Sequence, residues 1–156
     1  MSPVYPGDDA FRSAFAEKSM RTSQARNKKV VRHILCRIEQ RLGGAALDAG
    51  SDTFNLEHIL PENPGVGWDA FTEAEVEALS DRLGNLTLLA TGANQDIGNA
   101  PFATKRPTYA ASAFAITRKV AADNADWTPE RIAARQNWMA HQAATLWRID
   151  TPSALP

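Results

Sequence analysis

The sequence predicts a mainly helical α+β fold in which two short strands lie near the middle of the chain. Apolar residues recur at helical spacing across residues 24–42 and again across residues 129–148. Between these segments lie two β-prone runs, FNLEHILP at 54–61 and LGNLTLLA at 83–90. Two short strands cannot enclose a core by themselves, so the surrounding helices must pack on them.

The N-terminal segments carry two helix signals of different strength. Residues 8–20 suit a short helix, because acids lie in its first turn and Phe11 and Phe15 are four residues apart. Residues 24–42 predict a longer helix, which a Gly-Gly pair ends. Its apolar stripe consists of Val30, Val31, Ile34, Leu35, Ile38 and Leu42.

The remaining elements are read from turn and capping residues. PENPGVGW (61–68) is a loop, and residues 72–84 begin a helix with Thr72 and Glu75 as a capping box. TGANQDIGN (91–99) is a polar turn that opens another helix, and residues 101–123 look mostly helical. Thr128 and Pro129 then start a final helix that runs to about residue 148.

Length and composition predict one domain spanning residues 1–156, with 44% hydrophobic and 22% charged residues. The single cysteine, Cys36, excludes an internal disulfide and a cysteine-based zinc cluster. No apolar run reaches the roughly 20 residues that span a bilayer, so no membrane association is expected. The N-terminal MSPVYPGDDAF lacks the features of a secretory signal, and a cytoplasmic location is expected.

Charge is segregated along the chain although the net charge is only -1. Residues 18–41 hold eight positive residues and one acid, whereas residues 57–81 hold seven acids and no Lys or Arg. Such a basic stripe could bind a phosphate backbone, with Lys28, Lys29 and Arg32 as candidate contacts. The alternative is a solvated helix face without a partner.

The polar residues of the central segment suit phosphodiester hydrolysis. His58 is the residue type that accepts a proton from water near neutral pH. A hard divalent ion would stabilise the leaving oxygen, and Glu57 and Asn94 offer it oxygen ligands. Neighbours on a strand face opposite ways, so Glu57 and His58 would approach a bound phosphate from different sides. Asn85 or a loop carbonyl could hold His58 in one tautomer.

The spacing of these residues resembles a known family. E-H-I-x-P at 57–61 and G-N-L-T-L-L at 84–89 precede Asn94, which lies nine residues after Asn85. An N-x(4)-N-x(2)-F-x(2)-K-x(3)-Y-x(2)-S pattern then runs from 94 to 112, and W-T-x-E-x-I-x-x-R lies at 127–135. From about Tyr5 to Ile149 the chain resembles the C-terminal HNH (His-Me finger) nuclease domain of GmrSD-type, modification-dependent restriction endonucleases. SspE-like antiphage effectors, linked to DNA phosphorothioation, carry the same kind of domain.

The resemblance implies a ββα-metal core of two short antiparallel strands and a helix around one ion. This core would span about residues 53–106, between a helical N-terminal part at about 8–43 and C-terminal helices at about 107–149. The implied catalytic residues are His58, as general base, and Asn85, which braces the metal loop. Glu57 and Asn94 would hold one Mg²⁺ or Mn²⁺, and Lys105 with Arg106 would meet DNA phosphate.

Some assignments stay open at this stage. Asn99 rivals Asn94 as a ligand, and Asp52 and Asp96 are alternative carboxylates. Glu replaces the Asp that is commoner at the first ligand position, so ion preference could differ. Trp68 lies in the central loop and is a candidate for the site. The residues expected to be structural are His33, Cys36, Trp127, Trp138, His141 and Trp147.

The function implied is a metal-dependent DNA endonuclease of restriction or antiphage defence, which nicks or cuts DNA and leaves 5′-phosphate ends. The resemblance implies an N-terminal nucleotide-hydrolysing sensor domain as partner. This chain itself contains no Walker-type phosphate loop. One alternative is a DNA-binding module that keeps the fold without cutting and binds through residues 24–42. Another is an RNase or toxin-like HNH nuclease, because this chemistry does not inspect the sugar.

Overall fold

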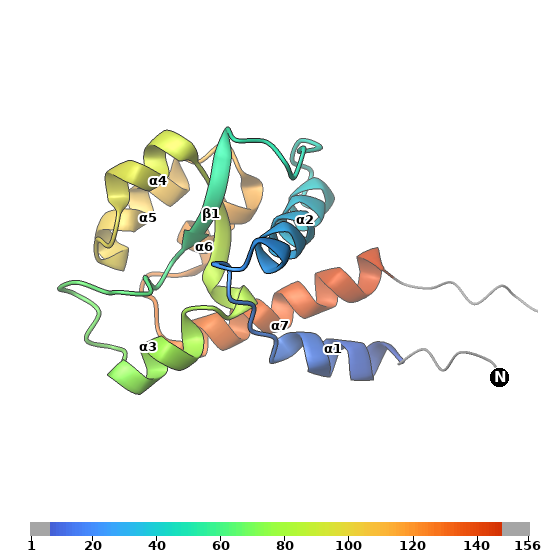
Figure 1. Cartoon of the computed structure of the whole chain (residues 1–156), viewed down its shortest axis with the longest axis horizontal. Coiled ribbons are helices and arrows are strands. Elements are labelled where there is room, and N and C mark those ends of the chain that lie inside the picture. Colours follow the sequence, from blue (N-terminus) through green and yellow to red (C-terminus); the bar gives the residue numbers. More distant parts are fainter. Residues whose placement is uncertain (1–6, 148–156) are drawn as a thin grey trace, which may run out of the picture.

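The computed structural model describes residues 7–147, and within this range it confirms a mainly helical α+β fold (Figure 1). Two strands and one 3₁₀ turn lie among seven α-helices in the described range. In chain order the elements are α1 (Asp8–Ala16), α2 (Ala25–Arg41), β1 (Phe54–His58), α3 (Glu73–Leu79), the 3₁₀ turn η1 (Leu83–Asn85), β2 (Leu86–Ala90), α4 (Thr91–Ile97), α5 (Phe102–Ala110), α6 (Ala115–Asp123) and α7 (Pro129–Leu146).

The two strands form an antiparallel pair that a helix follows directly. Glu57 lies opposite Thr87 and His58 opposite Leu86, and α4 begins at the residue after β2. The two paired strands β1 and β2 are therefore followed along the chain by the helix α4. Side chains alternate along β1, so Glu57 is buried while His58 keeps part of its surface exposed.

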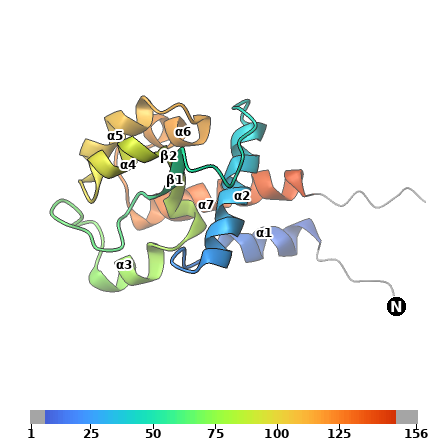
Figure 2. The same ribbon diagram turned by 45° about the horizontal axis from the view of Figure 1, so that its top comes forward.

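Helices cover the strand pair from both sides. The strands lie between α2 on one side and α4, α5 and α6 on the other, and α1 runs alongside α7 (Figures 1 and 2). The apolar stripe of α2 supplies Val31, Leu35 and Ile38 to one core cluster. A second cluster lies beneath α5 and α6 and includes Leu60, Tyr109 and Trp127. The end of β1 is thus held between two packed regions.

Two predicted capping signals are confirmed. The Thr72 side chain accepts from the Glu75 backbone, and the Glu75 carboxylate accepts from the Thr72 backbone at the start of α3. The Thr128 side chain accepts from the backbone N–H of Arg131, with Pro129 in the first turn of α7. These helix starts follow from local sequence because the capping partners are three residues apart.

Two predicted helices are shorter than expected. The first ends at Ala16 rather than near residue 20, and α3 ends at Leu79 rather than at Gly84. The residues that follow the two helices pair with each other instead. The backbone N–H of Met20 donates to the backbone carbonyl of Asp81 at 2.9 Å, and the backbone N–H of Leu83 donates to the backbone carbonyl of Lys18 at 3.3 Å. Backbone pairing between distant segments therefore replaces the helical hydrogen bonds that local propensity favours.

The basic segment contributes two buried charges to the fold. Glu39, its only acid, accepts at 2.8 Å from the backbone N–H groups of Ala115 and Ile116 at the start of α6. The Arg32 side chain is buried, and its guanidinium donates to the backbone carbonyls of Ala49, Ser51 and Phe54. The expectation that Arg32 contacts DNA phosphate is therefore wrong, because its donors fix the segment that leads into β1.

Gly84 lies where η1 meets α7, and the approach leaves no room for a side chain. A Cβ atom at this position would overlap the backbone carbonyl of Ile132 and lie 2.8 Å from Cβ of Gln136. The Gly84 backbone N–H also donates to the Gln136 side chain at 3.1 Å. The glycine of the G-N-L-T-L-L run is thus required by close packing against a helix backbone.

Replacing this glycine should destabilise the protein. We expect Gly84→Ala to lower the free energy of unfolding by about 1–3 kcal/mol, because η1 or α7 must shift to admit the methyl group. Chemical denaturation measures the change. Gly92→Ala is the matched control, since a Cβ there meets nothing within 4 Å and alanine favours helix. Equal stability of Gly84→Ala and the wild type would contradict the close packing.

Candidate active site

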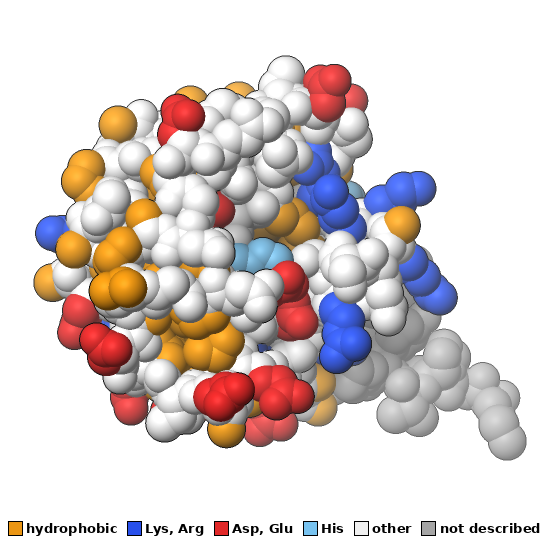
Figure 3. Space-filling model, turned by 60° about the vertical axis from the view of Figure 1, so that its left-hand side comes forward, with side chains coloured by type: hydrophobic (Ala, Val, Ile, Leu, Met, Phe, Trp, Pro, Cys, Tyr) orange, Lys and Arg blue, Asp and Glu red, His pale blue; other side chains and the backbone are white. Residues whose placement is uncertain are grey.

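A polar cleft of about 230 Å³ lies where β1 ends. It brings together three residues that the sequence predicted for the site, Glu57, His58 and Asn94. The other lining residues are Leu56, Pro61, Glu62, Asn63, Gly98 and Asn99. Figure 3 shows a histidine side chain in a hollow beside acidic groups. A cavity of similar volume, about 220 Å³, lies between α6 and α7 and is lined by none of the predicted residues.

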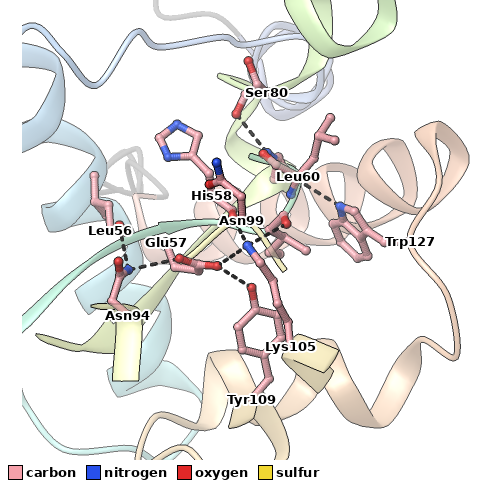
Figure 4. A network of polar contacts seen from close by, with 12 residues as sticks. Leu56, Glu57, His58, Leu60, Ser80, Asn94, Asn99, Lys105, Tyr109 and Trp127 are labelled. Carbon is pink, nitrogen blue, oxygen red and sulfur yellow. Dashed lines mark hydrogen bonds and ion pairs between the residues drawn. The ribbon is translucent and has the colours of Figure 1, made fainter. Parts of the chain in front are cut away.

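Glu57 is the centre of a buried polar network (Figure 4). Its side chain is almost fully buried, with 4% of the residue exposed. Oε1 accepts from Lys105 Nζ at 2.6 Å and from the Tyr109 hydroxyl at 2.7 Å. Oε2 accepts from the Asn94 amide at 3.0 Å. Lys105 and Tyr109 are four residues apart on α5 and therefore share a helix face, so this network joins β1 to α4 and α5.

Lys105 lies inside the protein and not at its surface. Only 1% of the residue is exposed, and its ammonium also donates to the backbone carbonyls of His58 at 2.9 Å and Ile59 at 3.1 Å. The expectation that Lys105 contacts DNA phosphate is therefore wrong, because Glu57 and the two carbonyls occupy its donors. It acts as the counter-ion of Glu57 and as a brace for the end of β1.

Burial changes the acid–base behaviour of both α5 residues. Desolvation lowers the pKa of Lys105, and the neighbouring charge of Glu57 opposes this shift. Burial, with the Glu57 charge as a second cause, raises the pKa of Tyr109 well above its ordinary value. Tyr109 therefore remains a neutral hydrogen-bond donor to Glu57 over the whole physiological range.

His58 occupies the opposite face of β1 and has two carboxylates beside its ring. Its Nε2 atom lies 3.5 Å from Asp81 Oδ1 and 3.5 Å from Glu62 Oε1. The sequence prediction named neither carboxylate. Glu62 follows His58 by four residues in the loop after β1, so its proximity could have been suspected. Asp81 lies 23 residues away, and no local signal links it to His58.

Asn85 is fully buried and clamps the loop that follows β1. Its Oδ1 accepts from the backbone N–H of Leu60 at 2.8 Å and from Trp127 Nε1 at 3.1 Å. Its Nδ2 donates to the carbonyls of Leu60 and Ser80, both at 2.9 Å. All four hydrogen-bonding positions of the amide are filled by partners outside the cleft. Asn85 therefore holds the loop after His58 without lining the cleft itself.

The rival ligands have different surroundings. Asn99 lines the cleft, but its side-chain amide donates to the backbone carbonyl of Asn63. The backbone carbonyl of Asn99 accepts from Trp68 Nε1. Trp68 is buried, so it ties the central loop to the end of α4 and does not face solvent. Asp52 and Asp96 are exposed and are not among the residues that line the cleft.

The remaining predicted phosphate contacts lie outside the cleft. Lys28 and Lys29 are exposed on α2. Arg106 is exposed on α5, where its Nε donates to the carbonyl of Ala121 at 3.0 Å. Lys and Arg side chains gather at one side of the hollow in Figure 3, and acidic side chains gather at its lower edge. The charge separation seen in the sequence thus persists on the folded surface.

Comparison with known protein families identifies the family of this chain. The model of the C-terminal domain of GmrSD restriction endonucleases matches residues 5–142. The chain belongs to this family. No curated protein matches the sequence closely enough to count as a relative. A GmrSD C-terminal domain is a nuclease-type domain of a restriction endonuclease, which makes DNA its substrate class. In the described part of this GmrSD domain, no helix is long and apolar enough to cross a membrane.

The buried Glu57–Lys105 pair gives a stability prediction. Lys105→Met leaves the Glu57 carboxylate without its counter-ion, and we expect it to lower the free energy of unfolding by about 3–5 kcal/mol. Adding Glu57→Gln in the same chain should recover part of this loss, because the uncompensated charge is removed. Denaturant unfolding of the single and double variants provides the coupling energy.

Lys119→Met is the matched control for this experiment. Lys119 pairs with Asp123 at 2.7 Å, but both side chains are well exposed, so its loss should cost at most about 1 kcal/mol. A Lys105→Met variant that unfolds like Lys119→Met would show that the Lys105 ammonium is not a buried partner of Glu57.

Proposed function

We propose that this chain is a metal-dependent DNA endonuclease domain of the HNH type, with His58 as the base that activates water. The observation that carries the proposal is the cleft at the end of β1. His58 lines it from one face of the strand, and the Glu57–Asn94 pair lines it from the other face. A proton acceptor and a set of oxygen ligands thus meet in one open, polar cavity, as phosphodiester hydrolysis requires.

Glu57 and Asn94 suit one Mg²⁺ or Mn²⁺. Lys105 and Tyr109 occupy Oε1 of Glu57, while Oε2 lies next to the Asn94 amide. Carboxylate and amide oxygens are the donors that hard divalent ions prefer, and Asn94 would present its Oδ1 atom. When bound, the ion supplies positive charge for the phosphate and the leaving 3′ oxygen. Lys105 already balances the charge of Glu57, so we expect tight binding only when DNA phosphate completes the ligand set.

His58 holds its ring proton on one nitrogen and takes a proton from water on the other. Nε2 faces the carboxylates of Asp81 and Glu62, which can only accept hydrogen bonds when ionised. The neutral ring therefore keeps its N–H at Nε2 and its lone pair at Nδ1. Nδ1 is then the atom that accepts the proton of the attacking water. Asn85 supports this arrangement indirectly, by fixing the loop that follows His58.

The charge distribution favours one side of the cleft for DNA. Lys28 and Lys29 are exposed on α2, and we propose that they contact the phosphate backbone on that side. Arg106 is exposed on α5, across the strand pair, and would contact a separate stretch of the backbone. The loop and helix from Glu62 to Asp81 carry acids and would repel DNA from the other side. We also propose that a separate, nucleotide-hydrolysing sensor domain controls this domain, and that it acts in the cytoplasm.

The catalytic role of His58 can be tested by plasmid nicking with Mg²⁺, Mn²⁺ or EDTA. We expect metal-dependent loss of supercoiled DNA, and we expect His58→Ala to slow it by about 10²–10⁴-fold because the general base is lost. His33→Ala is the matched control, since His33 is exposed on α2 and does not line the cleft.

A gel-shift assay on the same DNA and a parallel cleavage assay on RNA give the other outcomes a distinct meaning. Cleavage that survives in His58→Ala would reject His58 as the base. DNA binding without cleavage under any metal would support a non-cleaving binding module. Cleavage of RNA but not of DNA would indicate a toxin-like ribonuclease.

The proposed DNA contacts of α2 give a salt-dependence prediction. Lys28→Ala with Lys29→Ala should weaken binding to any DNA sequence and reduce the slope of log K against log salt by roughly 2, one for each lost phosphate contact. Binding titrations at several salt concentrations measure this slope. Arg131→Ala, which removes an exposed charge from α7, should leave the slope unchanged. An unaltered slope in the double variant would remove α2 from the DNA interface.

A further inference from the structure

Among the described residues, the carboxylates beside His58 have no Lys or Arg within ion-pair distance, although Arg21 lines the same surface pocket as both of them. Glu57 is neutralised by Lys105, but within residues 7–147 neither Glu62 nor Asp81 forms an ion pair with a Lys or Arg. Their only recorded side-chain partner in that range is the His58 ring. Two carboxylates therefore converge on one imidazole, with His58 and Glu62 lining the cleft and Asp81 in the neighbouring surface pocket that Glu62 also lines.

The three side chains have the spacing of a metal-ligand set. Their ligand atoms all lie within 4.8 Å of one another, and both carboxylates lie 3.5 Å from Nε2. Tetrahedral Zn²⁺ with bonds of about 2.0–2.1 Å places its ligands roughly 3.3 Å apart. Small side-chain rotations would close this difference, and Glu62 has a half-exposed side chain in a loop, so it can adjust.

We propose that His58, Glu62 and Asp81 form a site for a transition-metal ion such as Zn²⁺, separate from the Glu57–Asn94 pair, and that its occupation switches the nuclease off. Three protein ligands with one solvent-facing position are typical of open zinc sites. The imidazole nitrogen favours Zn²⁺ over Mg²⁺, which prefers an all-oxygen set. The two sites therefore select different ions although they share one cleft.

Binding at Nε2 would remove the base by changing its tautomer. Formation of the metal–Nε2 bond displaces the proton from that nitrogen, and the neutral ring then carries its proton at Nδ1. The ion would exchange one water ligand for Nε2, the Nε2 proton would leave through solvent and Nδ1 would take one up, with no change of oxidation state. The lone pair that takes the proton of water would then be lost. The inhibitory effect rests on the proposed role of His58, whereas the binding of the ion does not.

Metal binding is tested by isothermal calorimetry of untagged protein with Zn²⁺, without DNA. The wild type should bind one Zn²⁺ per chain, and His58→Ala, Glu62→Gln and Asp81→Asn should each weaken binding by roughly 10- to 100-fold or more. Thermal melts of the apo-proteins identify a variant that fails to fold, and the exposed Glu62 makes Glu62→Gln the safest of the three.

Two control variants separate this site from its surroundings. Asp69→Asn removes an exposed acid of the same acidic segment, and Asn94→Ala removes a ligand of the proposed catalytic ion. Both should bind Zn²⁺ like the wild type. The proposal is overturned if the wild type shows no saturable binding, if Glu62→Gln and Asp81→Asn bind as it does, or if Asn94→Ala abolishes binding.

Inhibition is tested by adding Zn²⁺ to Mg²⁺-supported nicking, with each protein compared with its own uninhibited rate. Zn²⁺ should slow nicking by the wild type at the concentrations that saturate the site measured by calorimetry. Asp81→Asn should need a Zn²⁺ concentration at least about tenfold higher for the same inhibition, because it binds Zn²⁺ more weakly. Equal sensitivity of the two proteins would refute the switch. Because calorimetry contains no DNA, a wild type without nuclease activity would contradict the proposed function and leave the binding result standing.

Discussion

The buried ion pair between Glu57 and Lys105 is the interaction on which the rest of the site depends. A carboxylate out of contact with water costs several kcal/mol unless a counter-charge and hydrogen bonds compensate it. Lys105 and Tyr109 of α5 provide both, and Asn94 of α4 completes the shell. Because Lys105 also holds the carbonyls of His58 and Ile59, the same contact that neutralises Glu57 fixes the backbone at the end of β1.

A second clamp acts just before β2. Asn85 joins the Leu60 backbone to Trp127 and Ser80, and the adjoining Gly84 packs directly against α7. The cleft is therefore held by side chains with filled hydrogen-bonding positions rather than by the loop alone. A site that must place its groups within a fraction of an ångström needs such support from rigid elements.

The two faces of β1 have opposite electrostatic characters. On the Glu57 side the negative charge is balanced internally, so an ion would gain affinity chiefly through the DNA phosphate that it contacts. On the His58 side, the carboxylates of Glu62 and Asp81 form no ion pair with a Lys or Arg among residues 7–147. The chain belongs to the GmrSD C-terminal family, a family of nuclease-type domains, so this difference between the two faces lies at a candidate nuclease site. In our proposals, the ion held by Glu57 and Asn94 depends on the DNA substrate, whereas the ion held through His58 on the other face of the strand does not.

Local sequence was sufficient to predict the fold class, the helix starts at Thr72 and Thr128 and the positions of the two strands. A sequence motif also singled out Glu57, His58 and Asn94, which the fold brings to one cleft. The helix starts depend on partners a few residues apart. The site residues belong to a motif whose spacing can be recognised in a single sequence. The packing of distant segments, by contrast, buries Lys105 and Arg32 and brings Asp81 beside His58. Whether a charged side chain faces water or the interior depends on acceptors from distant segments, and no local pattern of charge contains that information.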